Sequence, residues 1–448
     1  MDEPLAPLPV APAAAQPAAG APPPPPGSHR LLADPDVLKL WSAQAISELG
    51  SRITREGIPL TALLVLHAGA VQMGLLNALG GIAVLVFGLA AGVWIDRLRR
   101  RPVLIAADLG RATLLASIPA AALAGRLTMA QLYAVAALAG VMTVFFYVAD
   151  QSYLPALVDR ERILEANSKL TLSSTIAEIA GPGLTGFLVQ AITAPIAILF
   201  DALSFLASAL LLAGIRKREP PPPRRPPEHV LAATLAGMRH IFADPVLRPL
   251  GLRSATAWVF HGFLGTLYML FAIDVLGLRP GVLGIVIATG GASATAGAFL
   301  APRLERRVPL GPTFLATSAI YGLTLFLVPL AGLAGTAAPP AAPPAGAGSP
   351  GGWLAVALLI AAQLIGDMMF TVYSINEVSL RQRVAPPDLL GRINAGMQLL
   401  ARGVYPLGAL LGGYLGARLG VRPTLALAAA GLLLSTLWLL PATLRRLR

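Results

Sequence analysis

The sequence predicts an all-α polytopic membrane protein with twelve transmembrane helices in two pseudo-symmetric six-helix bundles. Three observations predict this fold: an apolar composition, long uncharged runs separated by arginine-rich loops, and a weak repeat between the two halves. Of the 448 residues, 56% are hydrophobic and 12% are charged, and the mean hydropathy is +0.71. Soluble proteins carry about 25% charged residues, so the composition excludes an ordinary soluble domain.

The loop Gly92–Pro102 sets the expected topology. It ends an uncharged run that begins at Ala70, and it holds one acid and four arginines. Each exposed arginine costs about 2.5–3.5 kcal/mol at the centre of a membrane helix, so this stretch must be the tip between two spanning helices. Short arginine-rich loops stay in the cytoplasm, which predicts that this tip is cytoplasmic.

Twelve spans follow if about 20 apolar residues cross a core of about 30 Å. Their expected limits are 38–62, 70–95, 103–123, 128–149, 169–191, 194–215, 250–273, 281–302, 311–333, 353–376, 393–417 and 422–441. Alternate loops collect nearly all of the basic residues, and the opposite loops hold little beyond Arg126, Arg279, Arg418 and Arg422. This asymmetry predicts that both termini are cytoplasmic, in a bacterial inner (plasma) membrane.

Composition divides the chain into five expected regions. They are a disordered cytoplasmic Pro/Ala-rich tail (1–35), an N-terminal six-helix bundle (36–215), a cytoplasmic linker with an amphipathic helix (216–249), a C-terminal six-helix bundle (250–441) and a basic cytoplasmic tail (442–448). In the linker, Leu231, Leu235, Met238 and Phe242 recur at helical spacing, which predicts one apolar face lying in the membrane interface.

A weak internal repeat relates the two halves. Gly74–Gly81 aligns with Gly284–Gly291 at one constant offset. Parallel repeats of six spans, with a substrate site near the membrane midplane between them, are one way in which secondary transporters are built.

The loop between the second and third spans resembles a known signature. Its pattern Gly-x-x-x-Asp-Arg-x-x-Arg-Arg is similar to the cytoplasmic loop motif of the major facilitator superfamily, and the matching positions are Gly92, Asp96, Arg97, Arg100 and Arg101. Arg99 stands where the family usually has glycine, so the turn is expected to differ. The alternative is a generic positive-inside loop.

Further stretches resemble the bacterial drug-efflux (drug:proton antiporter) branch of that superfamily, which includes macrolide and siderophore exporters. They are Tyr153–Asn167 and Ser379–Asn394. The run 180–186 is similar to the antiporter motif through Gly181, Pro182 and Gly186, with Thr185 in place of one glycine. A packing kink is the alternative for that run. The arginine that the family usually carries in span four is absent.

The resemblance implies a cytoplasmic gate. In the family this loop latches the inner side when the outer side is open, so Asp96 is expected to face the start of span eleven near Gly391–Asn394. Asp108 and Arg111 are an i,i+3 pair in span three and are expected to support the loop from behind. The alternative is an arginine that snorkels beside its counter-ion.

Energy coupling is expected to come from an ion gradient, because the sequence contains no Gly-x-x-x-x-Gly-Lys-Ser/Thr phosphate loop. Charged groups at membrane depth survive only if they are paired, neutralised or facing a cavity. The candidates for proton coupling or substrate binding are Glu48, Arg52, Glu56, Glu178, Asp367 and Arg402. Purely structural ion pairs, Glu48 with Arg52 and Asp367 with Arg402, remain the alternative.

Two other polar residues in the spans are given structural roles. Asp201 lies nearer the outer end of span six and is expected to be an interfacial acid. His261 is expected to be a core histidine satisfied by a neighbouring carbonyl.

The expected function is proton-coupled efflux of amphipathic organic compounds by alternating access, with the lipid bilayer, the substrate and protons as partners. The residues expected near the cavity suit such molecules and are Gln44, Asn77, Tyr147, Trp258, Tyr268, Gln363 and Tyr373. The chain is expected to be monomeric, with no catalytic residues, metal, cofactor or nucleic acid. The alternatives are an importer or uniporter of the same fold, a non-transporting scaffold or sensor, and an intramembrane enzyme, which is disfavoured because no catalytic cluster appears.

Overall fold

The structure is a computed structural model that describes residues 34–95, 97–159, 162–217, 219, 230–335, 350–387 and 389–441. The predicted N-terminal tail and basic C-terminal tail lie outside these ranges, apart from residues 34 and 35. Every regular element in these ranges is helical. The first bundle contains α1 (Pro35–Leu64), α2 (Ala70–Ile95), α3 (Arg100–Leu123), α4 (Met129–Leu157), α5 (Ile163–Ile192) and α6 (Ala194–Ala213).

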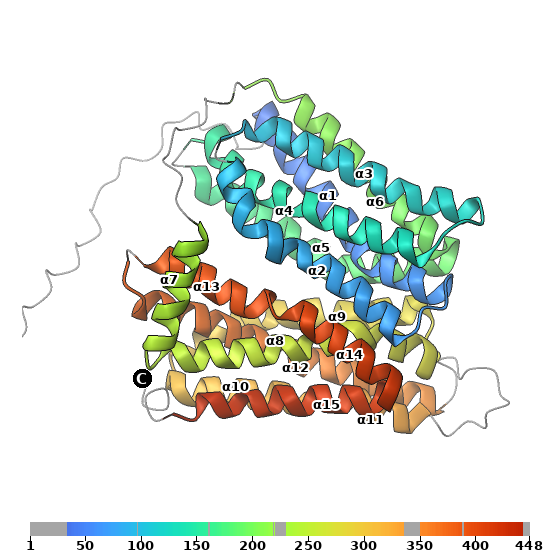
Figure 1. Ribbon diagram of the computed structural model, residues 1–448, viewed down its shortest axis with the longest axis vertical. Helices are drawn as coiled ribbons and strands as arrows, with labels where there is room; N and C mark the ends of the chain where they lie inside the picture. The colour runs from blue at the N-terminus through green and yellow to red at the C-terminus, as the bar shows by residue number, and fades with distance from the viewer. Residues whose placement is uncertain are drawn as a thin grey trace, which may run out of the picture.

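The second bundle follows α7 (Val230–Ala243), which belongs to the linker. It contains α8 (Leu247–Leu270) with η3 (Phe271–Val275), α9 (Pro280–Glu305), α10 (Leu310–Thr324), α11 (Leu327–Gly335), α12 (Pro350–Val384), α13 (Leu390–Arg402), α14 (Tyr405–Leu419), α15 (Val421–Leu434) and η4 (Ser435–Leu439). Figure 1 shows α1–α6 grouped on one side and α8–α15 on the other.

The described helices confirm the predicted twelve spans. Ten of them are long and apolar enough to cross a membrane by themselves. The remaining two are α1, which carries four charged residues between Glu48 and Glu56, and the α13–α14 segment, which is interrupted at Gly403. A charge-bearing span is tolerated where its polar face lines a cavity, which is where α1 places these residues.

The bundles meet through two equivalent helix crossings, α2 with α14 and α5 with α9. A Cβ atom added at Gly74 would lie 2.7 Å from the Ala409 carbonyl oxygen and 3.0 Å from the Gly413 Cα. At the other crossing, a Cβ added at Gly284 would lie 3.1 Å from the Gly186 Cα. Gly74 and Gly284 are the first residues of the sequence repeat, so the repeat corresponds to a structural pseudo-symmetry.

Both crossings lie toward the same face of the protein. Gly74 is near the start of α2 and Gly186 is near the end of α5, and these ends are remote from the arginine-rich loop between α2 and α3. Backbone contact of this kind requires glycine, because any side chain would separate the helices. The bundles are therefore held together on the face opposite the arginine-rich loops.

The linker helix α7 packs on α13 and α8, and Figure 1 shows it standing beside α13. Of its described side chains, Thr234, Gly237 and Ile241 are buried, whereas Leu235 and Phe242 are 54% and 39% exposed. Leu235 and Phe242 of the predicted apolar face therefore do not pack on the protein, and the membrane-interface position predicted for that face stays a prediction. The side of α7 that packs on α13 approaches it closely: the Gly237 backbone lies against the Arg392 carbonyl, where a larger residue would not fit.

Candidate functional site

A cavity of about 510 Å³ lies between the two bundles, bounded by α1 and α5 on one side and by α9 and α12 on the other. Of the described residues that line it, five are charged. We call it the charged cavity, and its charged residues are Arg52, Arg55, Glu56, Glu178 and Asp367. Four of the six residues predicted for coupling or binding thus come together in one place.

Arg52 links the two helices of the first bundle that form this cavity. Its Nη2 lies 2.8 Å from the Glu48 Oε1, one turn away on α1, and its Nη1 lies 3.4 Å from the Glu178 Oε1 on α5. The predicted Glu48–Arg52 pair is confirmed. Among the described ion pairs Arg52 does not pair with Glu56, which lines the charged cavity separately.

Glu48 itself faces a second space, which we call the N-bundle cavity. This cavity has a volume of about 290 Å³ and is lined by Gln44, Glu48, Arg111, Tyr147 and Asp150, among others. Arg52 therefore connects an acid of the N-bundle cavity to an acid of the charged cavity.

Asp367 and Arg402 do not form the alternative structural pair in the described residues. Asp367 lines the charged cavity, where Gly290 of α9 leaves the space that its carboxylate occupies. Arg402 lines a third cavity of about 450 Å³ between α2, α4 and α13, together with Tyr147. The two charges therefore line different cavities, and the helices that carry them, α12 and α13, do not pack closely on each other.

The antiporter-like motif lies on the helix that joins the bundles. A Cβ added at Gly181 would lie 2.5 Å from the Arg52 Cβ, so this glycine lets α1 and its arginine approach α5. The Pro182 carbonyl faces Gly284 and the Gly186 backbone faces Pro280 and Gly284 on α9. The motif thus sets how closely α5 approaches both α1 and α9. Thr185 is buried at this position and donates to the Gly181 carbonyl at 2.8 Å.

The predicted gate motif begins in α2, which contains Gly92. Asp96 is outside the described residues, so its expected position near Gly391–Asn394 stays a prediction. Arg97 and Arg99 are exposed. The φ of Arg99 is −70°, a conformation open to any residue, so this position does not need the glycine that the family usually has.

An acid of the linker, which the sequence analysis missed, caps the helix that follows this motif. The backbone N–H groups of Arg100 and Arg101 donate to the Glu219 carboxylate at 2.8 and 3.1 Å, and the Arg100 Nη1 lies 3.3 Å from it. A carboxylate at a helix N-terminus is favourable because it satisfies free N–H groups and meets the positive end of the dipole. The linker therefore still contacts the first bundle at Glu219.

The predicted Asp108–Arg111 ion pair forms, and it is fully buried among α3, α4 and α6. The guanidinium carbon of Arg111 lies 4.3 Å from the Phe146 ring centroid and 3.9 Å from that of Phe205. The side chain is thus enclosed by aromatic rings. This contradicts the alternative of a snorkelling arginine, while the role of the pair in supporting the loop stays a prediction.

Two predictions about single polar residues have clear outcomes. The His261 Nδ1 lies 2.9 Å from the Ala257 carbonyl oxygen, which confirms a satisfied core histidine, and its Nε2 lies 2.7 Å from the Tyr321 hydroxyl. Asp201 is not an interfacial acid: its exposure is 0% and its carboxylate accepts from the Ser204 hydroxyl at 2.9 Å. The rotation of α6 about its axis points this side chain into the first bundle. The position of a residue along a span does not reveal that rotation.

A buried arginine in the second bundle, Arg253, was not among the predicted residues. Arg253 donates to Ser318 and lies 3.7 Å from the Tyr373 ring centroid. Tyr373 was expected near the cavity but is buried against this arginine. Of the other residues expected there, Gln363 lines the charged cavity, and Gln44 and Tyr147 line the N-bundle cavity.

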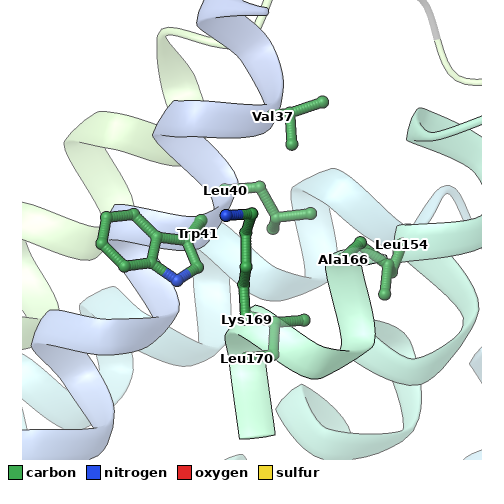
Figure 2. A pocket seen from close by; sticks show the side chains of 7 residues that line it. All are labelled: Val37, Leu40, Trp41, Leu154, Ala166, Lys169 and Leu170. Carbon is green, nitrogen blue, oxygen red and sulfur yellow. The ribbon is translucent and has the colours of Figure 1, made fainter. Parts of the chain in front are cut away.

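A small pocket near the start of α1 is not a substrate site. Figure 2 shows the Lys169 side chain extending from α5 toward Trp41 and Leu40 of α1, with Leu154 and Ala166 beside them. Its volume is about 10 Å³, roughly the space of one water molecule. The Trp41 Nε1 donates to Ser173 at 3.1 Å next to it, so this region packs α1 against α5.

Comparisons with known proteins agree with this arrangement. The family model of the Major Facilitator Superfamily matches residues 40–404. The uncharacterised MFS-type transporter YfiS of Bacillus subtilis (strain 168) is 25% identical over 403 residues, covering 89% of this chain and 90% of that protein. The multidrug efflux pump Tap of Mycolicibacterium fortuitum is 26% identical over 425 residues, covering 92% and 97%.

Solved structures show the same fold at low identity. A bacterial homologue of the iron transporter ferroportin in an inward-facing state has a TM-score of 0.70 at 19% identity and covers 92% of this chain and 98% of that one. The nucleoside transporter NupG has a TM-score of 0.68 at 13% identity and covers 93% and 100%. With the family match, the twelve spans and the cavity between two bundles, the chain belongs to the Major Facilitator Superfamily and is a multi-pass membrane transporter rather than an enzyme.

Proposed function

We propose that this transporter is a proton-coupled exporter of amphipathic organic compounds. The observation that carries the proposal is the charged cavity, in which three carboxylates and two guanidinium groups from both bundles surround one space of about 510 Å³. Such a volume lies within the range of about 300–1,000 Å³ that is typical of sites for drug-sized molecules.

The walls of the charged cavity suit a molecule with both an apolar body and a charge. Pro182, Ile287 and Phe370 supply apolar surface, and Asp367 supplies a carboxylate that has no ion-pair partner among the described residues. An amphipathic cation would place its ring against Phe370 and its charge near Asp367. The similarity to Tap, a protein named as a multidrug efflux pump, favours the same class of substrate.

Transport would proceed by rocking of the bundles, which we assign to residues 36–215 and 250–441, with 216–249 as the connection. The glycine crossings hold the bundles together on the face opposite the arginine-rich loops. The charged cavity is lined by residues nearer the other face, such as Ala298 in the last third of α9 and Thr371 in the second half of α12. If that other face is cytoplasmic, as the arginine distribution predicts, substrate enters the charged cavity from inside the cell and leaves when the crossings open.

Proton coupling would use the Glu48–Arg52–Glu178 bridge. A substrate or proton that neutralises Glu178 weakens its attraction for Arg52, which then pairs only with Glu48. Occupancy of the charged cavity thereby changes a contact between α1 and α5. Because α5 also crosses α9, this contact is placed to alter how the two bundles meet.

The test uses purified protein in phosphatidylethanolamine/phosphatidylglycerol vesicles, with ethidium as the amphipathic cation. An imposed pH gradient should drive ethidium accumulation, and Glu178→Gln should abolish it. Glu165→Gln is the matched control, since Glu165 is an exposed acid on the same helix and pairs only loosely with Lys169 at 3.9 Å.

Each alternative has its own result in this experiment. Ethidium movement that is equal with and without the gradient would indicate a uniporter, and accumulation in the opposite sense would indicate an importer. No movement of ethidium by a correctly folded protein would contradict the proposed substrate class and would favour a scaffold or sensor. We further propose residence in the bacterial plasma membrane as a monomer with both termini cytoplasmic.

A further inference from the structure

The interior of the first bundle contains a second group of acids, separate from the charged cavity. Asp108 lies on α3, Asp150 on α4 and Asp201 on α6, and all three approach the guanidinium of Arg111 closely enough to interact with it electrostatically. The exposures of Asp108 and Asp201 are 0%, and that of Arg111 is 4%. Asp150 is bonded to the amide of Gln44 on α1. We call these four charged residues the buried acid cluster.

The charges of the buried acid cluster do not balance. One guanidinium faces three carboxylates, and the two rings of Phe146 and Phe205 lie close to that guanidinium. Arg111 bonds directly to Asp108. In a buried, low-dielectric setting, an ionised carboxylate without its own counter-ion is strongly unfavourable. Arg111 offsets Asp108, so the fully buried Asp201 is expected to be neutral or to bind a cation, whereas Asp150 is partly buried and lines the N-bundle cavity.

Individual oxygen atoms point to the same conclusion. The Oδ2 atoms of Asp108 and Asp201 are buried and have no hydrogen-bond partner among the described residues. The hydroxyl of Ser208 lies beside Asp108, and that of Thr54 lies beside Asp201. A hydroxyl can donate to a carboxylate or accept from a carboxylic acid, so these neighbours suit an acid that gains and loses a proton.

The surroundings of Asp201 fit a proton. The polar neighbours of the Asp201 carboxyl are hydroxyls, and a carboxylic acid can donate to them without any further ligand.

The cluster is connected to the proposed coupling residues. Arg111 and Asp150 line the N-bundle cavity together with Gln44 and Glu48. Glu48 in turn pairs with Arg52, which reaches Glu178 in the charged cavity. Among the described residues that line the N-bundle cavity, Glu48 of α1 is the charged group that faces the cluster from a neighbouring helix, while α5 contributes Ser173 and Ser174.

We propose that Asp108, Asp150 and Asp201 form an exchangeable proton-binding site inside the first bundle, which communicates with the substrate cavity through Glu48 and Arg52. The inference rests on the proposed function in one respect: it gives the transported proton a binding site that is distinct from the substrate site. Binding of a proton there removes negative charge beside α1, α3, α4 and α6, and so changes the packing of the bundle that must move.

The experiment records infrared spectra of the whole protein in phosphatidylethanolamine/phosphatidylglycerol vesicles as the pH is raised, with no substrate present. The wild type should show the carbonyl stretching band of a protonated carboxylic acid at neutral pH, and the band should disappear reversibly on alkalinisation. Asp201→Asn should remove part of the band and retain the wild-type melting temperature, because a neutral amide replaces a neutral acid of the same shape. Asp159→Asn, at an exposed loop acid, is the matched control and should change neither.

Three results would overturn the proposal: no such band in the wild type, a band that does not respond to pH, or a band that Asp108→Asn, Asp150→Asn and Asp201→Asn all leave intact. Misfolding of Asp201→Asn would also count against it, because it would mean that an ionised Asp201 is needed to offset Arg111. Because no substrate is used, this test is independent of the ethidium experiment. If the protein passes the infrared test but does not accumulate ethidium, the proton-binding site is supported and only the proposed export function is rejected.

Discussion

Arg52 on α1 donates to Glu178 on α5, with 3.4 Å between Nη1 and Oε1, although 126 residues separate them in the chain. The same guanidinium holds Glu48 at 2.8 Å. Two carboxylates thus share one cation at the boundary between the N-bundle cavity and the charged cavity. Neutralising either acid leaves Arg52 attracted to the other acid alone, so a shared cation of this kind can transmit a change in one cavity to the other.

Glu48→Gln should uncouple transport without unfolding the protein. Arg52 keeps Glu178 as a counter-ion, so the free energy of unfolding should fall by no more than about 1 kcal/mol, the value typical of a partly exposed pair. Accumulation of ethidium driven by a pH gradient should fall to the level seen without a gradient, while downhill exchange continues. Transport in vesicles and the melting temperature in detergent measure the two effects.

The double variant Glu48→Gln/Glu178→Gln supplies the contrast. It leaves Arg52, whose side chain is 15% exposed, without either carboxylate, so the free energy of unfolding should fall further than in the single variant, because a partly buried guanidinium then lacks these counter-ions. Full gradient-driven accumulation by a folded Glu48→Gln protein would show that Glu48 is structural, and Glu178 would then be the first candidate for the coupling acid.

Gly186→Ala should impair the closed crossing between α5 and α9. The added methyl group would press against the Pro280 carbonyl and lie 3.0 Å from the Gly284 Cα, and overpacking of this kind typically costs about 1–3 kcal/mol. We expect slower ethidium transport and faster reaction of a cysteine placed at Gln190, which bonds to Gly281 across the crossing. Gly183→Ala is the control on the same helix, because its Cβ would meet only the Ala288 Cβ at 4.0 Å. Equal behaviour of the two variants would mean that the crossing tolerates a wider separation.

Acid should weaken the contact between Asp36 on α1 and the backbone of Arg216 and Lys217, which follow α6. Burial alone would raise the pKa of Asp36, but hydrogen bonds from the backbone N–H groups of Arg216 and Lys217 and from Lys39 outweigh it and hold the pKa below its usual value. A lowered pKa in the folded state means that the stabilisation is complete above the unfolded pKa of about 3.9 and is lost as the pH falls through the folded value. This contact should therefore be unchanged at neutral pH.

Hydrogen exchange of a peptide covering residues 210–217 measures this effect after correction for the intrinsic pH dependence. Protection should decrease only below about pH 4 in the wild type and should be low at all pH values in Asp36→Asn. Asp159→Asn should behave as the wild type. Loss of protection between pH 6 and 8 in the wild type would contradict the assignment to Asp36.

Single cysteines should establish the orientation, since the native chain contains none. Arg126→Cys, in the exposed turn between α3 and α4, should react with an impermeant maleimide in intact cells. Pro221→Cys, in the linker, should react only after the membrane is opened. Labelling of the linker cysteine in intact cells would place the arginine-rich loops outside and reverse the transport direction proposed above.

The sequence by itself determined the spans, the arginine-rich loops and the existence of a repeat. These features depend on composition and on local spacing: apolar runs need lipid or a core, and clustered arginines cannot enter either. The Glu48–Arg52 and Asp108–Arg111 pairs could be predicted for the same reason, because residues three or four apart share one face of a helix whatever surrounds it.

Only the tertiary structure decided which groups meet across helices. It brought Glu178 to Arg52, separated Asp367 from Arg402, turned Asp201 into the first bundle and placed Gly237 rather than Leu235 of α7 against α13. Each outcome depends on the rotation of a helix about its axis and on where it crosses its neighbour. Those two variables are set by close packing over the whole bundle, and a hydrophobic membrane span, apolar on nearly every side, carries little local pattern that could reveal them.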